Sequence, residues 1–247
     1  NDGGGGIFCW GSSPSITLNN IHDNTAYNGA GIMLYAESSP LILHNEIASN
    51  TASASGRGGG LFVYSKNTPD VINNIIADNE AYYGGAFAYR DSCFGKIVNN
   101  TIFGNLAYEA NLRFEEDANP DLYNNIVWSN TSSSAGNIYI GDDSCDPNFF
   151  YCVVENPSIW NYSGTYTGTF QAYDLYPEFA DTVSGDFSLS QNSPYLNLGS
   201  PDTSGLNIPE VDLAGNPRIY NGGTVDIGAY EYQGGGRVQM AQRDLHG

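Results

Sequence analysis

The sequence predicts an all-β fold, a right-handed parallel β-helix of about six coils with an irregular C-terminal cap. Three observations favour this solenoid: a repeat of 25 to 29 residues, two asparagine positions that recur in register within it, and an aliphatic residue that is constant between them. Strands in such a fold stack at about 4.8 Å, so equivalent residues of successive coils lie directly above one another. Stacked asparagine side chains can then hydrogen-bond from coil to coil.

Each repeat opens with glycine, or with asparagine in the last two, followed by a short apolar strand. We expect a positive φ at this opening residue, because glycine adopts it without steric cost. A turn that usually contains proline comes next, then a second apolar stretch and the asparagines. The six openings are residues 6–10, 31–35, 60–64, 85–89, 111–115 and 137–141. The asparagines form one set of Asn19, Asn45, Asn74, Asn100 and Asn125 and a second set of Asn24, Asn50, Asn79, Asn105 and Asn130.

Alternation along the opening strand predicts which side chains face the interior and which face outward. Small and aliphatic residues, such as Ile7 and Cys9 in the first coil, fall on the interior side. The two outward columns are mostly aromatic over four coils, and flat aromatic rows stack well on the apolar faces of sugar rings. The candidate ligand-binding residues are therefore Trp10, Tyr35, Tyr64, Tyr89, Phe62 and Phe87. The alternative is that the C-terminal third or a partner chain covers this face.

The turn after the aromatic strand carries acidic side chains. Asp91, Asp117 and Asp143 fall in one predicted column, and carboxylate oxygens on flexible turns suit a Ca²⁺ ion. The same three carboxylates, with Arg90 or Lys66 as a basic partner, are the candidate catalytic groups of a polysaccharide lyase or glycoside hydrolase. A solvated acidic rim that binds nothing is the third interpretation.

Composition narrows the range of partners. With 8 basic and 27 acidic residues the formal net charge is −19, which disfavours nucleic acid and anionic lipid as partners. It also disfavours acidic polysaccharides, unless a divalent cation bridges the two. No apolar run approaches 18 residues, so no membrane span is expected. Four cysteines are too few for a disulfide scaffold, although Cys145 and Cys152 flank one turn and could pair.

The repeat predicts a single domain in which residues 1–156 form the coils and residues 157–233 cap the last coil, followed by a tail or linker over 234–247. The first coil begins almost at residue 1, and an open solenoid end exposes unpaired strand edges. We therefore expect further residues before residue 1, or a second molecule stacked on that end.

Four segments near the C-terminus, residues 185–189, 193–199, 212–218 and 225–231, resemble the closing segment of bacterial right-handed β-helix surface proteins of the choice-of-anchor group. The coil motifs are similar to those of polymorphic outer-membrane proteins and of the pectate-lyase-like superfamily. This resemblance implies a β-helix that is secreted or held on a bacterial cell surface, with an anchor after the tail. The chain itself shows no recognised catalytic motif of a lyase or polygalacturonase.

Three hypotheses for function follow from these patterns. The first is a non-catalytic module that binds glycan or mediates adhesion through its aromatic columns. The second is a structural subunit that stacks end to end through its first coil. The third is a polysaccharide lyase or glycoside hydrolase that uses the acidic column.

Overall fold

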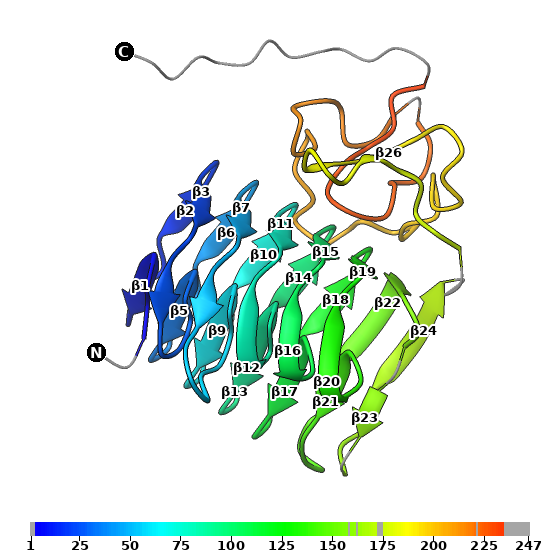
Figure 1. The fold of residues 1–247 in the computed structure, drawn as a ribbon. Coiled ribbons are helices and arrows are strands. Elements are labelled where there is room, and N and C mark those ends of the chain that lie inside the picture. The colour runs from blue at the N-terminus through cyan, green and yellow to red at the C-terminus, as the bar shows by residue number, and fades with distance from the viewer. Residues whose placement is uncertain (1–2, 158, 162, 172–174, 221, 235–247) are drawn as a thin grey trace, which may run out of the picture.

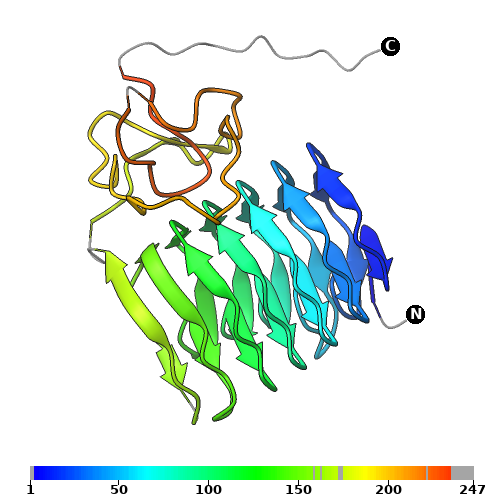
Figure 2. The same cartoon turned by 180° about the vertical axis from the view of Figure 1, so that it is seen from behind.

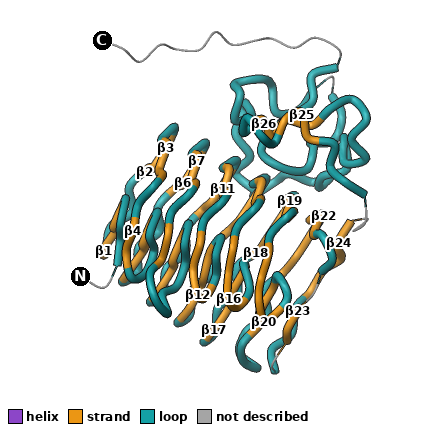
Figure 3. The backbone as a smooth tube through the Cα atoms, in the orientation of Figure 1, coloured by secondary structure: helices purple, strands orange, loops and turns teal. Residues whose placement is uncertain are grey.

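The computed structural model describes residues 3–157, 159–161, 163–171, 175–220 and 222–234. Their strands stack in a parallel solenoid, and residues 175–220 and 222–234 form a C-terminal lobe beside it (Figure 1). Figure 3 shows strands and loops only, and no helix among the described residues is long and apolar enough to cross a membrane. The predicted fold class is confirmed. The predicted tail lies outside the described residues from residue 235 onward.

The first sheet is made by the apolar strand that opens each coil. Its strands pair in parallel, and each pairing step advances by one coil, as when Ile7 lies opposite Ile32 and Ile32 opposite Leu61. In spatial order the strands are β1 (Ile7–Trp10), β5 (Ile32–Tyr35), β9 (Leu61–Tyr64), β13 (Phe87–Arg90), β17 (Leu112–Glu115), β21 (Ile138–Ile140) and β23 (Ile159–Asn161).

The second sheet consists of two rows of strands on either side of the first asparagine turn. The row before the turn contains β2 (Ser15–Thr17), β6 (Leu41–Leu43), β10 (Asp70–Ile72), β14 (Lys96–Val98) and β18 (Asp121–Tyr123). The row after the turn contains β3 (Asn20–His22), β7 (Glu46–Ala48), β11 (Ile75–Ala77), β15 (Thr101–Phe103) and β19 (Ile126–Trp128). The long strand β22 (Asn148–Val154) pairs with both β18 and β19 and so joins the rows, and β24 (Thr167–Gln171) pairs with β22.

The third sheet follows the second asparagine turn and closes the coil. Its strands are β4 (Thr25–Ala26), β8 (Thr51–Ala52), β12 (Glu80–Tyr83), β16 (Leu106–Glu109) and β20 (Thr131–Ala135). One antiparallel pair in the lobe, β25 (Phe179–Asp181) with β26 (Asp186–Leu189), completes the strands of the described residues.

Two asparagine ladders stabilise the turns between these sheets, as the sequence predicts. In the middle of the first ladder, Asn74 Nδ2 donates to Asn100 Oδ1 at 3.0 Å. It also donates to the carbonyl oxygens of Ile42 and Ile72, at 2.9 and 3.0 Å. The Oδ1 atom of Asn74 accepts both the side-chain and the backbone amide of Asn45. Each inner asparagine therefore pairs polar groups that the turn would otherwise bury without partners.

The second ladder, which runs from Asn24 to Asn130, repeats this pattern. The residue before each ladder asparagine has a left-handed backbone, as at His44 (φ 56°) and Asn73 (φ 51°). His44 is a turn residue whose Nε2 lies 3.2 Å from the Val211 carbonyl oxygen of the lobe.

The glycines that open the coils are required by space and not by φ. Gly31 and Gly60 do not have positive φ, whereas Gly29 and Gly58, two residues earlier, do. A Cβ atom on Gly31 would lie 2.5 Å from the carbonyl oxygen of Gly60 in the next coil. The expectation of a positive φ at the opening residue is therefore wrong. In the first three coils glycine leaves room for the backbone of the next coil, whereas Ala86 and Asn111 carry a side chain at the equivalent position.

The interior of the solenoid is one continuous apolar cluster that runs from Cys9 to Val154. All four cysteines are free and buried, so Cys145 and Cys152, which could have paired, do not. Cys152 instead ends the first ladder, where Asn125 Nδ2 lies 3.7 Å from its sulfur.

The coils continue past the predicted boundary at residue 156, because β23 pairs with β21 and β24 pairs with β22. The expected cap over the last coil is also wrong, since the lobe lies along the side of the solenoid in both views (Figures 1 and 2). The strands β11, β15 and β19 carry apolar side chains on their outer faces, which need cover. Phe179, Phe187 and Ile227 of the lobe supply it by packing with Ile126 and Trp128.

Candidate functional site

The strand register places two of the predicted ligand-binding residues in the interior. Phe87 lies opposite Leu61, and Tyr89 lies opposite Val63. The two side chains are 1% and 0% exposed. The expectation that Phe87 and Tyr89 face outward is therefore wrong.

The register differs from the prediction because the fourth coil opens with Ala86 where the third opens with Gly60. The Leu61 amide donates to the Ala86 carbonyl, as the Gly60 amide donates to that of Gly85, so each position in this strand lies one residue later than an alignment on the last glycine gives. The outward positions of β13 are consequently Ala88, opposite Phe62, and Arg90, opposite Tyr64.

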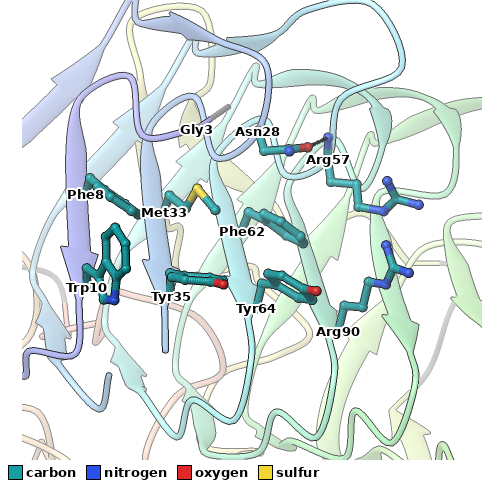
Figure 4. Close-up of a pocket in the computed structure, with 10 residues that line it drawn as sticks. All are labelled: Gly3, Phe8, Trp10, Asn28, Met33, Tyr35, Arg57, Phe62, Tyr64 and Arg90. Atoms are coloured by element: carbon teal, nitrogen blue, oxygen red, sulfur yellow. Dashed lines mark hydrogen bonds between the residues drawn. The ribbon is translucent and has the colours of Figure 1, made fainter. Parts of the chain in front are cut away.

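The other four predicted ligand-binding residues, Trp10, Tyr35, Phe62 and Tyr64, line a shallow groove on the outer face of the first sheet (Figure 4). One row comes from the second position of β1, β5 and β9, and a parallel row comes from the fourth. Gly3 and Asn28 border the groove, and two arginines lie at the end away from the first coil. The lining residues are Gly3, Phe8, Trp10, Asn28, Met33, Tyr35, Arg57, Phe62, Tyr64 and Arg90.

The rings of this groove contact one another within and between coils. Phe62 and Tyr64 on the same strand are nearly parallel, with centroids 5.7 Å apart and planes at 5°. The centroids of Tyr35 and Tyr64 are 5.6 Å apart, and those of Trp10 and Tyr35 are 5.5 Å apart. Trp10 is 68% exposed and Phe8 47%, whereas Phe62 is buried and the two tyrosines are half-buried. The groove thus combines a packed floor with aromatic surface that solvent can reach.

Arg57 and Arg90 form the polar end of the groove, and Figure 4 shows both guanidinium groups at that end. Arg57 belongs to the turn before β9, where its backbone amide donates to Asn28 Oδ1 at 2.9 Å. Arg90 ends β13, and its guanidinium lies 5.9 Å from the ring centroid of Tyr64.

A charged cluster supports this end from the following coil. Arg113 donates to Glu109 at 2.9 Å and to Glu115 at 2.8 Å, and its guanidinium lies over the rings of Tyr83 and Tyr139 at 4.5 and 3.9 Å. Burial disfavours the charged carboxylate of Glu115, but the hydrogen bond and the charge of Arg113 lower its pKa below the ordinary value. Arg113 and Glu115 therefore hold each other in their charged forms.

The acidic column of Asp91, Asp117 and Asp143 does not form as predicted. The Ser92 amide donates to the Glu116 carbonyl at 2.7 Å, which sets Ser92, and not Asp91, level with Asp117. Asp117 accepts a hydrogen bond from the side chain of Asn119 at 2.8 Å. Within the residues that the structure describes, no group of three or more His, Cys, Asp and Glu side chains lies close enough to hold a metal ion.

The candidate catalytic residues do not converge on the groove. Of Asp91, Asp117, Asp143, Arg90 and Lys66, only Arg90 lines it. Lys66 is an exposed turn residue. The sequence placed Phe8 and Met33 in an outward column without proposing them as ligands, and it gave no signal for Arg57, which lies in the longest turn between two coils.

Comparison with known proteins agrees with this architecture. A family model described as a right handed beta helix region matches residues 1–172, which is 172 of the 247 residues. The match ends next to the last residue of β24, where the stacked coils also end. No curated protein matches the chain.

Proposed function

The chain belongs to the right-handed β-helix family, and on that premise we propose that it is a non-catalytic module that binds glycan in the aromatic groove of its first three coils. The observation that carries the proposal is the unbroken column of Trp10, Tyr35 and Tyr64, in which each coil adds one ring at a centroid spacing of 5.5 to 5.6 Å. Solvent-accessible aromatic rings in a row favour the apolar faces of successive sugar rings.

The polar groups around the rings suit the rest of a sugar. Asn28, the arginines and the tyrosine hydroxyl groups border the aromatic surface, and such groups exchange hydrogen bonds with sugar hydroxyls (Figure 4). The strands β5 and β9, which carry the middle rings of the groove, each pair with a neighbouring strand on both sides. Because the rings are held on a rigid sheet, little conformational freedom is lost when a ligand binds. The expected setting is a bacterial cell surface or the extracellular space, as the resemblance to surface proteins implies.

A glycan array with a matched pair of variants tests the proposal. The double variant Tyr35→Ala/Tyr64→Ala removes two rings from the groove. The control, Tyr82→Ala/Tyr108→Ala, removes two stacked tyrosines from neighbouring coils of the third sheet, whose centroids are 4.4 Å apart. We expect the wild-type chain and the control to bind the same glycans and the groove variant to lose them.

Two results would overturn the proposal. One is the absence of binding to any glycan by the folded wild-type chain. The other is loss of binding in the third-sheet control with retention in the groove variant, which would place the site on the other sheet.

A further inference from the structure

We propose that the groove ends in an anion subsite, in which Arg57 and Arg90 together bind a carboxylate or sulfate group carried by the glycan. This inference rests on the proposed function, because it assigns a ligand class to the same groove. It differs from the expectation from net charge, since arginine side chains and not a bridging cation would hold the acidic group.

Both arginines lie at the same end of the aromatic groove (Figure 4). Arg90 lies opposite Tyr64 in the strand register, so the aromatic column of Trp10, Tyr35 and Tyr64 continues directly into a guanidinium group. Arg57 reaches the same end of the groove from a different turn (Figure 4). A sugar ring stacked on Tyr64 would therefore bring its substituents next to both cations.

The arginines near this end differ in how strongly they are bound to carboxylates of the chain. Arg113 binds Glu109 and Glu115 through two short hydrogen bonds, and its side chain is only 6% exposed. Arg57 shares Glu115 with Arg113 and reaches it only through Nε, at 3.4 Å. Its two terminal nitrogens take no part in that contact, and these are the atoms that bind a planar carboxylate in pairs.

Arg90 is also weakly committed. Its Nη2 atom contacts Glu116 at 2.5 Å, but the side chain of Glu116 is 51% exposed. Exposed ion pairs contribute about 1 kcal/mol or less, so exchanging Glu116 for an anionic ligand costs little. The Nε atom of Arg90 is buried and has no hydrogen-bond partner among the described residues, so this side chain is held through Nη2 alone.

Basic side chains are scarce in this chain and unevenly distributed. The chain has only eight lysines and arginines against 27 acidic residues. Three of the eight, Arg57, Arg90 and Arg113, gather around this end of the groove, where Arg57 and Arg113 share Glu115. These cations share this end with Glu109, Glu115 and Glu116, so an anionic ligand would compete with those carboxylates for the guanidinium groups.

Paired oligosaccharides test this proposal. We would titrate the wild-type chain with an oligouronate, with a sulfated oligosaccharide of the same length, and with the same oligouronate after its carboxyl groups are reduced to alcohols. The buffer would contain a chelator and about 0.15 M salt, at which charges beyond roughly 8 Å are screened. We expect at least one acidic ligand to bind about tenfold more tightly than the neutral one. Whichever of the two acidic ligands, the oligouronate or the sulfated oligosaccharide, binds more tightly identifies the anionic group that the subsite prefers.

Three variants locate the effect. Arg57→Gln and Arg90→Gln should each reduce the ratio of acidic to neutral affinity about tenfold, and the neutral binding that remains shows that the groove is still folded. Lys66→Gln removes the same charge from an exposed turn outside the groove and should change acidic binding less than about twofold.

Four outcomes would overturn the anion subsite. They are equal affinity for acidic and neutral ligands, no effect of either arginine variant, an equal effect of Lys66→Gln, and acidic binding that disappears in chelator. In the first two outcomes neutral binding persists and the glycan groove stands. If neither the acidic nor the neutral oligosaccharides nor any array glycan binds, the proposed function itself fails.

Discussion

The coils and the C-terminal lobe bury polar groups in opposite ways. In the coils, one asparagine solution is repeated from rung to rung, and each inner ladder residue bonds to the rungs on both sides of it. In the lobe, one arginine and three carboxylates form a cluster that occurs once. The coils therefore spread their stability over many equivalent positions, whereas the lobe concentrates it at a single point.

The single point is Arg218, which is 1% exposed. Its Nη2 atom donates to the carbonyl oxygens of Asp226 and Gly228 at 2.8 and 2.6 Å. Asn99, from a turn of the solenoid, donates to the same two oxygens and so attaches the cluster to the coils. The three carboxylates, which each accept two backbone amides, belong to Asp212, Asp226 and Glu231.

Substitution of Arg218 should have the largest effect that separates the lobe from the coils. Arg218→Met leaves the three carboxylates buried without a cation and should cost about 3–5 kcal/mol. Because this cost falls on the lobe, we expect hydrogen exchange to accelerate in residues 175–234 while the amides of the inner coils keep their protection.

Lys96→Met is the matched control for this experiment. Lys96 Nζ touches the Gly205 carbonyl of the lobe from the partly exposed surface of the solenoid, so its loss should cost less than about 1 kcal/mol. Uniform loss of protection over coils and lobe in Arg218→Met would contradict the division into two regions.

A ladder substitution tests the repeated region. Asn74→Ala removes the side-chain hydrogen bonds to the carbonyls of Ile42 and Ile72 and leaves the backbone amide of Asn45 without its partner, so the free energy of unfolding should fall by about 3 kcal/mol. Asn19→Ala, at the exposed end of the same ladder, should cost about 1 kcal/mol or less. Denaturant titrations of the two variants measure both values, and equal costs would show that position along the ladder does not matter.

The lobe should also respond to pH in a way that the ladders cannot, since asparagine does not titrate. Burial, followed by the charge of Asp226, raises the pKa of Glu231 from 4.5 to about 7. The folded state then binds more protons than the unfolded state between pH 4.5 and 7, so the lobe loses stability as pH rises through this window. The loss is on the order of 3 kcal/mol at most.

Glu231→Gln should flatten the pH dependence of lobe stability across this window, whereas Glu37→Gln, which removes an exposed carboxylate of the solenoid, should not. Hydrogen exchange of the lobe amides at pH 5 and pH 8 measures the difference. Parallel profiles for the wild type and Glu231→Gln would show that another group controls the response.

The two regions also differ in how far sequence alone predicts them. The ladders could be predicted because the same residue recurs wherever the same turn geometry recurs. The register of β13 could not be read from the opening glycine, because Ala86 occupies that position in the fourth coil. The asparagines on either side, Asn79 and Asn105, would have been a better anchor than the glycine.

The polar end of the groove depends on a segment that does not repeat. Leu61 follows Asn50 by 11 positions, whereas Ile32 follows Asn24 by 8, and the longer turn carries Arg57. A residue that has no equivalent in other coils gives no periodic signal. The lateral position of the lobe could not be predicted for a related reason. The outer side chains of β11, β15 and β19 form one apolar surface only when the strands are stacked, so no single repeat shows that the lobe must pack there.

The central claim is that the first three coils bind glycan through their rings, and a calorimetric titration with the best-bound array glycan tests it most directly. Tyr64→Ala should weaken binding by roughly 1 kcal/mol, or about fivefold, while Tyr108→Ala on the third sheet should stay within about twofold of the wild type. Equal affinity of the wild type and Tyr64→Ala, with the weaker binding confined to Tyr108→Ala, would contradict the claim.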